Sequence, residues 1–255
     1  LAAFLQGCDL VGHGGTPFQL DGKDPQAELF EPTVKGTENF LEAIQRVPSI
    51  RKVVIIASVA AYNSDFPMLP KDRNAGDQVS EADAPYFNPQ SIPYAQAKYV
   101  ANMAVNDFIA ANPGLSFEIT SVSPTGVMGM ALSQRGDSTS MGLQYLIKNR
   151  IAPNPFIQMI YDNDIEWSMV DVTDVAEAVF KAAITVGLHG RNYLLASESY
   201  RVSDIHVMLN GSAPVNAPTI VYNSALAQKE LGVRFRSARE TLQSYAEAMV
   251  SAQPA

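Results

Sequence analysis

The chain has 255 residues, of which 47% are hydrophobic and 17% charged, which excludes a disordered protein and allows one domain with a large core. Its net charge of −8, with no basic cluster, argues against nucleic acid or an anionic membrane surface as a partner. A single cysteine, Cys8, excludes an internal disulfide and is typical of a reducing compartment. No apolar run approaches the roughly 18 residues that span a bilayer, and no secretory leader is recognised, so we expect a cytoplasmic protein without membrane contacts.

Strand and helix patterns alternate along the chain, which predicts an α/β fold with a doubly wound, mostly parallel sheet. In chain order, the patterns predict a strand at 9–13, a helix at about 25–47, a strand at 52–57, a loop at 62–92, a helix at 93–111, strands at 117–122 and 167–172, a helix at 175–183, a strand at 193–196, and helices near 224–231 and 238–250. We find no repeat and no clear linker. The sequence therefore predicts one domain, with a small C-terminal lobe packed on the sheet.

Three segments carry more specific expectations. Residues 53–56 form a continuous β-branched run, as expected for a central strand that is buried on both faces. The shorter run at 9–13 is also predicted to be a buried strand, which stops in a glycine-containing loop. Residues 62–92 are rich in Asp, Pro and Asn and predict a long surface loop. Loops of that length inside a compact domain usually carry function.

Tyr94 and Lys98 lie four residues apart on a predicted helix, so both side chains project from one face, about 6 Å apart. A lysine ammonium beside a phenol favours the phenolate, which predicts a pKa of Tyr94 below its usual value of about 10. Tyr94 would then act as a general acid for a carbonyl oxygen, or as the base in the reverse reaction. The alternative is an exposed surface pair without a catalytic role. In a chain with ten tyrosines, roughly 0.3 Tyr-x-x-x-Lys patterns are expected by chance, so the pattern alone is weak evidence.

Ser58 follows directly on the predicted strand at 52–57. Parallel α/β sheets bind their ligands at the carboxyl ends of the strands, so a hydroxyl there would hold a substrate carbonyl and stabilise the developing alkoxide. A serine that simply ends a strand is the alternative. The combination of Ser58 with Tyr94 and Lys98 favours the catalytic interpretation over both alternatives.

These residues and the segments around them resemble an extended short-chain dehydrogenase/reductase of the NAD-dependent epimerase/dehydratase superfamily. The likeness is to its dihydroflavonol reductase, cinnamoyl-CoA reductase and aldehyde/ketone reductase branch. It covers essentially the whole chain and is carried by seven segments: 7–17 (GCDLVGHGGTP), 32–39 (PTVKGTEN), 53–61 (VVIIASVAA), 93–98 (PYAQAK), 123–129 (SPTGVMG), 170–176 (VDVTDVA) and 223–232. The resemblance implies a Rossmann-like NAD(P)-binding part at 1–127 and a substrate-binding lobe over most of 128–255.

The resemblance also implies roles for particular residues. Tyr94 would be the acid/base, Lys98 would bind the nicotinamide ribose and tune Tyr94, and Ser58 would bind the substrate carbonyl. The residues expected to contact the cofactor, besides Tyr94 and Lys98, are Gly14, Gly15, Thr16, Pro124 and Val127. The cofactor would be NADP(H) or NAD(H), with NADP(H) favoured, and the substrate a small carbonyl compound or alcohol. A homodimer is compatible with the same resemblance.

Two departures from the family pattern matter. Thr33 stands where many extended members carry asparagine, which leans away from sugar-nucleotide epimerases. The chain also contains no Gly-x-x-Gly-x-x-Gly turn after a strand, although the dinucleotide site of this fold starts with one. Together with the first residue being leucine, this leads us to expect that an N-terminal segment precedes the sequence.

Other residues are open to two interpretations. The three histidines, His13, His189 and His206, lack metal-ligand spacing, so no metal site is expected. The remaining candidates would either line a substrate pocket or belong to the core: Met128, Met130, Tyr161 and Trp167.

Competing functions also stay open at this point. A nucleotide-sugar epimerase or dehydratase would use arginines to grip a diphosphate, and Arg135, Arg150, Arg191 and Arg201 are available. A non-catalytic dinucleotide sensor on the same fold would usually have lost the tyrosine or lysine. A chain that is inert because it cannot bind the cofactor is a further alternative.

Overall fold

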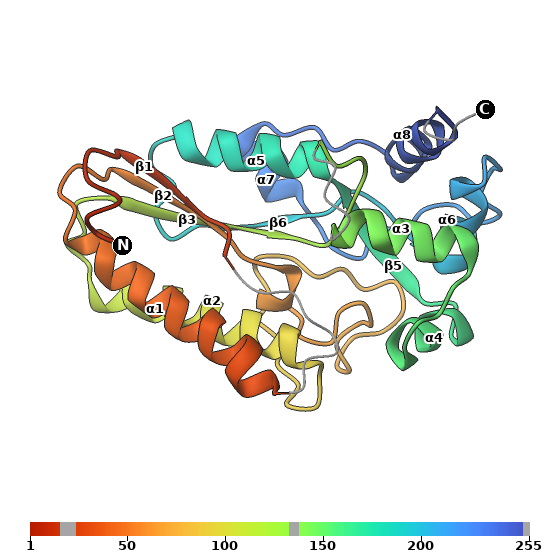
Figure 1. Ribbon diagram of the computed structural model, residues 1–255, viewed down its shortest axis with the longest axis horizontal. Coiled ribbons are helices and arrows are strands. Elements are labelled where there is room, and N and C mark those ends of the chain that lie inside the picture. The colour runs from red at the N-terminus through yellow and green to blue at the C-terminus, as the bar shows by residue number, and fades with distance from the viewer. Residues whose placement is uncertain (16–23, 133–137, 252–255) are drawn as a thin grey trace.

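The computed structural model describes residues 1–15, 24–132 and 138–251, with side chains described as far as residue 247. Figure 1 shows a central sheet with helices on both faces and a group of shorter elements at one end. The central sheet consists of parallel strands in the order β1-β2-β3-β6. Their bounds are Leu10–His13 (β1), Lys52–Ile56 (β2), Glu118–Pro124 (β3) and Asn192–Leu195 (β6). This arrangement confirms the predicted Rossmann-like α/β class.

The helices α1 (Glu31–Gln45) and α2 (Pro93–Ala111) pack against each other on one face of the central sheet (Figure 1). On the opposite face lie α5 (Val172–Ile184) and α7 (Ala225–Leu231). A predicted single helix at 25–47 is instead a π-helical turn, η1 (Gln26–Phe30), followed by α1. Pro32 stands in the first turn of α1, where its missing N–H costs least. The π-helical turn continues into α1, because Phe30 and Glu31 both keep a right-handed helical backbone.

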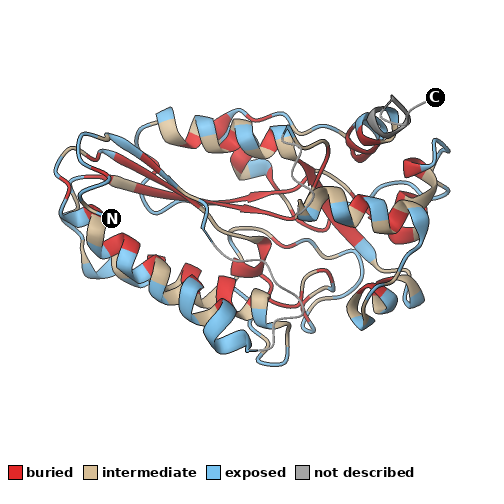
Figure 2. Cartoon of the chain, in the orientation of Figure 1, coloured by how far each residue is buried: buried red, intermediate tan, exposed pale blue. Residues whose placement is uncertain are grey.

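The strand β2 lies inside the sheet and is buried on both faces, as its β-branched run predicts. Val53 and Ile55 pack in the cluster beneath α1 and α2, whereas Val54 packs in the cluster beneath α5. Side chains alternate between faces along a strand, so the run supplies both clusters at once. Figure 2 shows the strands of this sheet as mainly buried.

The strand β1 differs from the prediction of a buried strand. Val11 is buried, but Leu10 is 42% exposed. Within the described residues β1 has a hydrogen-bonded neighbour, β2, on one side only, so it forms an edge of the sheet. An edge strand keeps one side and part of its faces open to solvent, which accounts for the difference.

A second, smaller sheet has the order β4-β5-β7. Its strands are β4 (Gly126–Met128), β5 (Glu166–Asp171) and β7 (Ser199–Arg201), with β4 parallel and β7 antiparallel to β5. The chain passes from the first sheet to the second at Thr125, whose N–H donates to the carbonyl of Leu195, 3.0 Å away. The surrounding helices are α3 (Thr139–Asn149), α4 (Pro155–Asp162), α6 (Val202–Leu209) and α8 (Ala238–Ser251).

The sequence patterns did not predict β4, β7, α3, α4 or α6. Each is short, from three to eleven residues, so too few apolar positions repeat to reveal a period. Their apolar side chains instead meet those of β5 and α8 in one cluster, to which Ile147, Ile160 and Leu242 contribute fully buried side chains. Packing against neighbours distant in sequence therefore stabilises these elements.

The loop at 62–92 is not wholly a surface loop, contrary to its polar composition. Asn63 and Ser64 are fully buried. The amide nitrogen of Asn63 donates to the carbonyl of Met68 and to the hydroxyl of Tyr222, both 2.8 Å away. Val79 forms a β-bridge with Tyr222 as well, so the C-terminal part of the chain holds this loop in place. Polar residues are buried here because they satisfy one another by hydrogen bonds.

Replacing Tyr222 by phenylalanine should therefore lower the free energy of unfolding by about 1 kcal/mol, because one N–H of Asn63 loses its buried acceptor. Tyr145→Phe is a suitable control, since Tyr145 is 54% exposed and its replacement should leave stability unchanged. Urea unfolding of both variants measures the difference. Equal stability of Tyr222→Phe and the wild type would contradict the importance of this contact.

Candidate active site

Ser58 lies at the carboxyl end of β2, where the chain turns away from the sheet. Its backbone is extended, and its hydroxyl accepts a hydrogen bond from the N–H of Ala60, 3.2 Å away. Ser58 thereby caps the short 3₁₀ helix η2 (Val59–Ala61). This cap fixes the hydroxyl at the strand end, the place that the sequence predicts.

Tyr94 and Lys98 lie in the first two turns of α2, which begins at Pro93 as predicted. The Tyr94 phenol and the Ser58 hydroxyl are hydrogen-bonded to each other. Lys98 is buried, and its ammonium donates to the carbonyl of Ile56, the last residue of β2, over 3.3 Å. The three residues predicted to be catalytic therefore gather at the end of one strand.

Burial has opposite effects on the two titrating groups. It raises the pKa of Tyr94 to about 12, and the hydrogen bond with Ser58 opposes this rise only in part. It lowers the pKa of Lys98 to about 8, because a buried ammonium loses its hydration. The expectation that the pKa of Tyr94 lies below its usual value is therefore wrong for this structure. Desolvation of the phenolate outweighs the hydrogen bond with Ser58, and Tyr94 is a protonated phenol at neutral pH.

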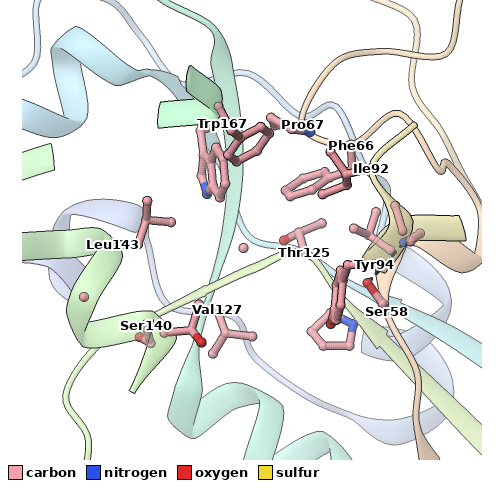
Figure 3. A pocket seen from close by; sticks show the side chains of 18 of the residues that line it. Ser58, Phe66, Pro67, Ile92, Tyr94, Thr125, Val127, Ser140, Leu143 and Trp167 are labelled. Carbon is pink, nitrogen blue, oxygen red and sulfur yellow. Dashed lines mark hydrogen bonds between the residues drawn. The ribbon is translucent and has the colours of Figure 1, made fainter. Parts of the chain in front are cut away.

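Ser58 and Tyr94 face a cavity of about 640 Å³ (Figure 3). Two further residues predicted to contact the cofactor, Pro124 and Val127, line the same cavity. Gly14 and Gly15 are placed just after β1, outside this lining. Thr16 lies outside the described residues. The structure thus brings together the catalytic candidates and the segment between the two sheets.

Most of the cavity wall was not predicted. Phe66, Pro67 and Ile92 come from the loop at 62–92. Helices α3 and α4 supply Leu143, Leu146, Phe156 and Ile157. The only sequence signal for these residues was the length of the loop, because α3 and α4 approach the site through tertiary packing. No charged side chain lies among the described residues that line the cavity.

Of the residues that would be either pocket or core, Trp167 lines the cavity. Met128 is fully buried in the core, and Met130 and Tyr161 pack against the same core cluster. Among the arginines considered for a diphosphate site, Arg191 forms an ion pair with Glu230, and neither Arg150 nor Arg201 lines the cavity. Arg135 lies outside the described residues.

The residues around Lys98 fit the ribose–nicotinamide half of a dinucleotide. The ammonium has three N–H donors, and within the described part of the chain Ile56 supplies its one hydrogen-bond acceptor. Buried donors of this kind favour a polyhydroxylated ligand that accepts from them.

The described residues form neither a metal-binding cluster nor a membrane-spanning helix. Over 1–15, 24–132 and 138–251, no group of three or more His, Cys, Asp or Glu side chains is placed to hold a metal ion. None of the helices in this part of the chain is both long and apolar enough to cross a membrane.

Two reductases with curated functions are similar in sequence to this chain. Cinnamoyl-CoA reductase CAD2 of Medicago truncatula is 31% identical over 193 residues, covering 75% of this chain and 55% of the plant protein. The NADPH-dependent methylglyoxal reductase GRE2 of Saccharomyces cerevisiae is 24% identical over 260 residues, covering 91% of this chain and 74% of the yeast protein. The chain thus spans little more than half the length of the plant relative.

The fold is also that of solved reductases. The crystal structure of Gre2 from Candida albicans in complex with NADPH matches with a TM-score of 0.79 at 23% identity, over 99% of this chain and 80% of that one. The family model described as "NAD dependent epimerase/dehydratase family" matches residues 1–196. This match covers most of the chain, including Ser58, Tyr94 and Lys98. The chain therefore belongs to the NAD-dependent epimerase/dehydratase family.

Proposed function

We propose that this chain carries the catalytic centre of an NADPH-dependent reductase that converts a small, uncharged aldehyde or ketone to the alcohol. The observation that carries the proposal is the convergence of Ser58, Tyr94 and Lys98 beside a cavity whose described lining has no charge. The similarity to an NADPH-dependent methylglyoxal reductase, named for a small neutral carbonyl substrate, supports the same chemistry.

Each of the three residues has a distinct task. Tyr94, protonated at neutral pH, donates its proton to the carbonyl oxygen of the substrate. The Ser58 hydroxyl donates a hydrogen bond to the same oxygen and stabilises the negative charge that develops there. Lys98 holds the ribose of the cofactor and, as an ammonium, stabilises the phenolate that Tyr94 becomes. The bound NADPH supplies the hydride that goes to the carbonyl carbon.

The protonation of Tyr94 favours reduction as the direction at neutral pH. A phenol whose pKa is raised by burial holds the proton that reduction consumes. The reverse reaction needs the phenolate, which burial of the site disfavours.

The cavity wall favours this function over the alternatives. A nucleotide-sugar substrate carries a diphosphate, which is normally bound by arginine or lysine, whereas the described lining offers hydroxyl, amide and apolar groups. The sensor hypothesis does not explain why the serine, tyrosine and lysine stand together in catalytic arrangement.

We further propose that the second sheet and helices α3, α4, α6 and α8, from within 128–255, form the substrate lobe. We also propose that the enzyme is cytoplasmic.

The test is a steady-state assay of the full-length protein with NADPH or NADH and a panel of neutral aldehydes and ketones. We expect consumption of NADPH, seen as loss of its near-ultraviolet absorbance, with formation of the alcohol. Cofactor binding without turnover of any carbonyl would favour the sensor. Tight binding of UDP or dTDP, measured by calorimetry, would favour the nucleotide-sugar alternative. Light scattering of the same sample tests whether the protein is a homodimer.

A further inference from the structure

Gly126 and Trp167 occupy the same space from two neighbouring strands. Gly126 begins β4 and pairs with Met169 of β5, two residues beyond Trp167. A β-carbon built on Gly126 would overlap the indole nitrogen of Trp167, and it would lie 2.8 Å from the Cε2 atom of the ring. It would also lie 3.0 Å from the carbonyl oxygen of Ser168. The indole therefore fills the volume that a side chain at position 126 would take.

Space, not backbone conformation, requires a glycine at this position. Gly129, three residues later, has φ of 109°, in the left-handed region that other residues avoid. The backbone of Gly126 does not lie in that region. A larger residue would fit the backbone at 126 but would have to displace the ring of Trp167. The two positions are therefore coupled by volume.

The indole forms one wall of the cavity beside the catalytic residues. Trp167 is 6% exposed and packs edge-to-face on Phe66, with ring centroids 5.3 Å apart. Figure 3 shows Trp167 on one side of the cavity and Tyr94 with Ser58 on the other. A carbonyl held at Tyr94 would thus direct its substituent toward this aromatic wall.

The surroundings hold the wall in place. Phe66 also contacts Tyr222, with ring centroids 6.0 Å apart, and Tyr222 accepts the hydrogen bond from Asn63. The indole nitrogen is buried and has no hydrogen-bond partner within the described residues. A buried N–H without an acceptor is unfavourable, so the ring is kept here by packing and shape, not by a polar contact.

We propose, on the basis of the reductase function above, that Trp167 is the residue that limits the size of the substrate. Gly126 admits the indole, and the indole closes the cavity opposite Tyr94. The substrates would be neutral carbonyl compounds with a compact aryl or branched alkyl substituent. Larger substituents would collide with the ring, and charged ones would be desolvated against Phe66, Trp167 and Leu143 without a counter-ion.

The test compares kcat/KM for 3-methylbutanal, benzaldehyde and biphenyl-4-carbaldehyde. Trp167→Ala should raise the ratio for biphenyl-4-carbaldehyde over 3-methylbutanal by about 10- to 200-fold, the range by which apolar pockets discriminate size. Trp167→Phe, which removes less volume and retains an aromatic ring, should shift the ratio in the same direction by less. It also keeps the test decisive if the alanine variant is too unstable to purify.

A volume exchange provides the matched control. In Gly126→Leu/Trp167→Ala, the leucine at 126 fills the space from β4 that the indole filled from β5, so the ratio should return toward the wild-type value. Gly126→Leu alone should reduce both activity and thermal stability, because the two side chains then compete for one volume. An unchanged ratio in both single variants at Trp167 would overturn the proposal.

Fluorescence separates this proposal from the reductase function. Trp167 is the single tryptophan of the 255-residue chain, so the emission lost in Trp167→Phe reports on the cavity wall itself. Benzaldehyde bound next to the ring should quench this emission in the wild type. Quenching without turnover of any carbonyl compound would support the role of Trp167 as a wall of the cavity and contradict the proposed reductase function. Turnover of benzaldehyde without quenching would contradict the role of Trp167 as a wall of the substrate cavity, while the proposed reductase function would still hold.

Discussion

Tyr94→Phe should reduce kcat for carbonyl reduction by about 100- to 10,000-fold, the usual contribution of a positioned general acid. Phenylalanine keeps the ring and its packing but removes the proton that reduction requires. It also removes one of the two hydrogen-bond partners that the Ser58 hydroxyl has among the described residues. Binding of NADPH, measured by fluorescence titration, should change little, because the loss falls on proton transfer. Activity that survives in Tyr94→Phe would contradict the proposed mechanism.

A matched control lies on the same helix. Tyr99 packs its ring on Phe87, with centroids 4.7 Å apart, and does not line the cavity. Tyr99→Phe should therefore retain wild-type kcat and KM. If both tyrosine variants lost activity equally, the cause would be a disturbance of α2 and not the loss of an acid.

Lys98→Met should produce a protein that is more stable but less active. Lowering the pKa of Lys98 from 10.5 to about 8 corresponds to about 3 kcal/mol of unfavourable free energy for the buried charge. Methionine has a similar length and no charge, so the variant should gain up to about that amount in unfolding free energy near neutral pH. Loss of the charged hydrogen bonds that we propose between Lys98 and the cofactor should weaken NADPH binding by about 10- to 150-fold.

The pH dependence of stability provides a second signature of Lys98. Below about pH 8 the lysine is protonated in both the folded and the unfolded state, so the penalty is fully present. Between about pH 8 and 10.5 the folded state releases the proton first. The unfolded state then binds more protons, and stability rises with pH as the penalty disappears. The stability advantage of Lys98→Met over the wild type should therefore shrink across this window.

Urea unfolding of both proteins at about pH 7 and about pH 9.5 measures this change. Comparing them pairwise cancels the titration of the tyrosines that Lys98 does not affect. His13, whose pKa is lowered from 6.5 by burial and by Lys98, is neutral at both pH values. Lys35→Met is the control, because Lys35 is exposed and pairs with Glu31 on the surface of α1. A wild-type advantage over Lys98→Met at neutral pH would show that the ammonium stabilises the fold, contrary to this account.

The sequence predicted the parts of the fold that depend on local patterns. The β-branched run at 53–56 identified the buried strand, and Pro93 marked the start of α2. The spacing of Tyr94 and Lys98, with Ser58 at a strand end, identified residues that the structure indeed brings together. These signals survive in the sequence because each depends on periodicity, chain stiffness or the position of a residue within one element.

Tertiary structure decided what depends on contacts between distant segments. The pKa of Tyr94 is raised, not lowered, because burial is contributed by the whole site and cannot be read from the distance to one lysine. The loop at 62–92 is partly buried because Tyr222, far along the chain, satisfies Asn63. The indole of Trp167 fills the space of a side chain at position 126 only because β4 and β5 pair. The sequence by itself thus determined the fold class and the candidate catalytic residues, whereas the electrostatics and shape of the cavity came from packing.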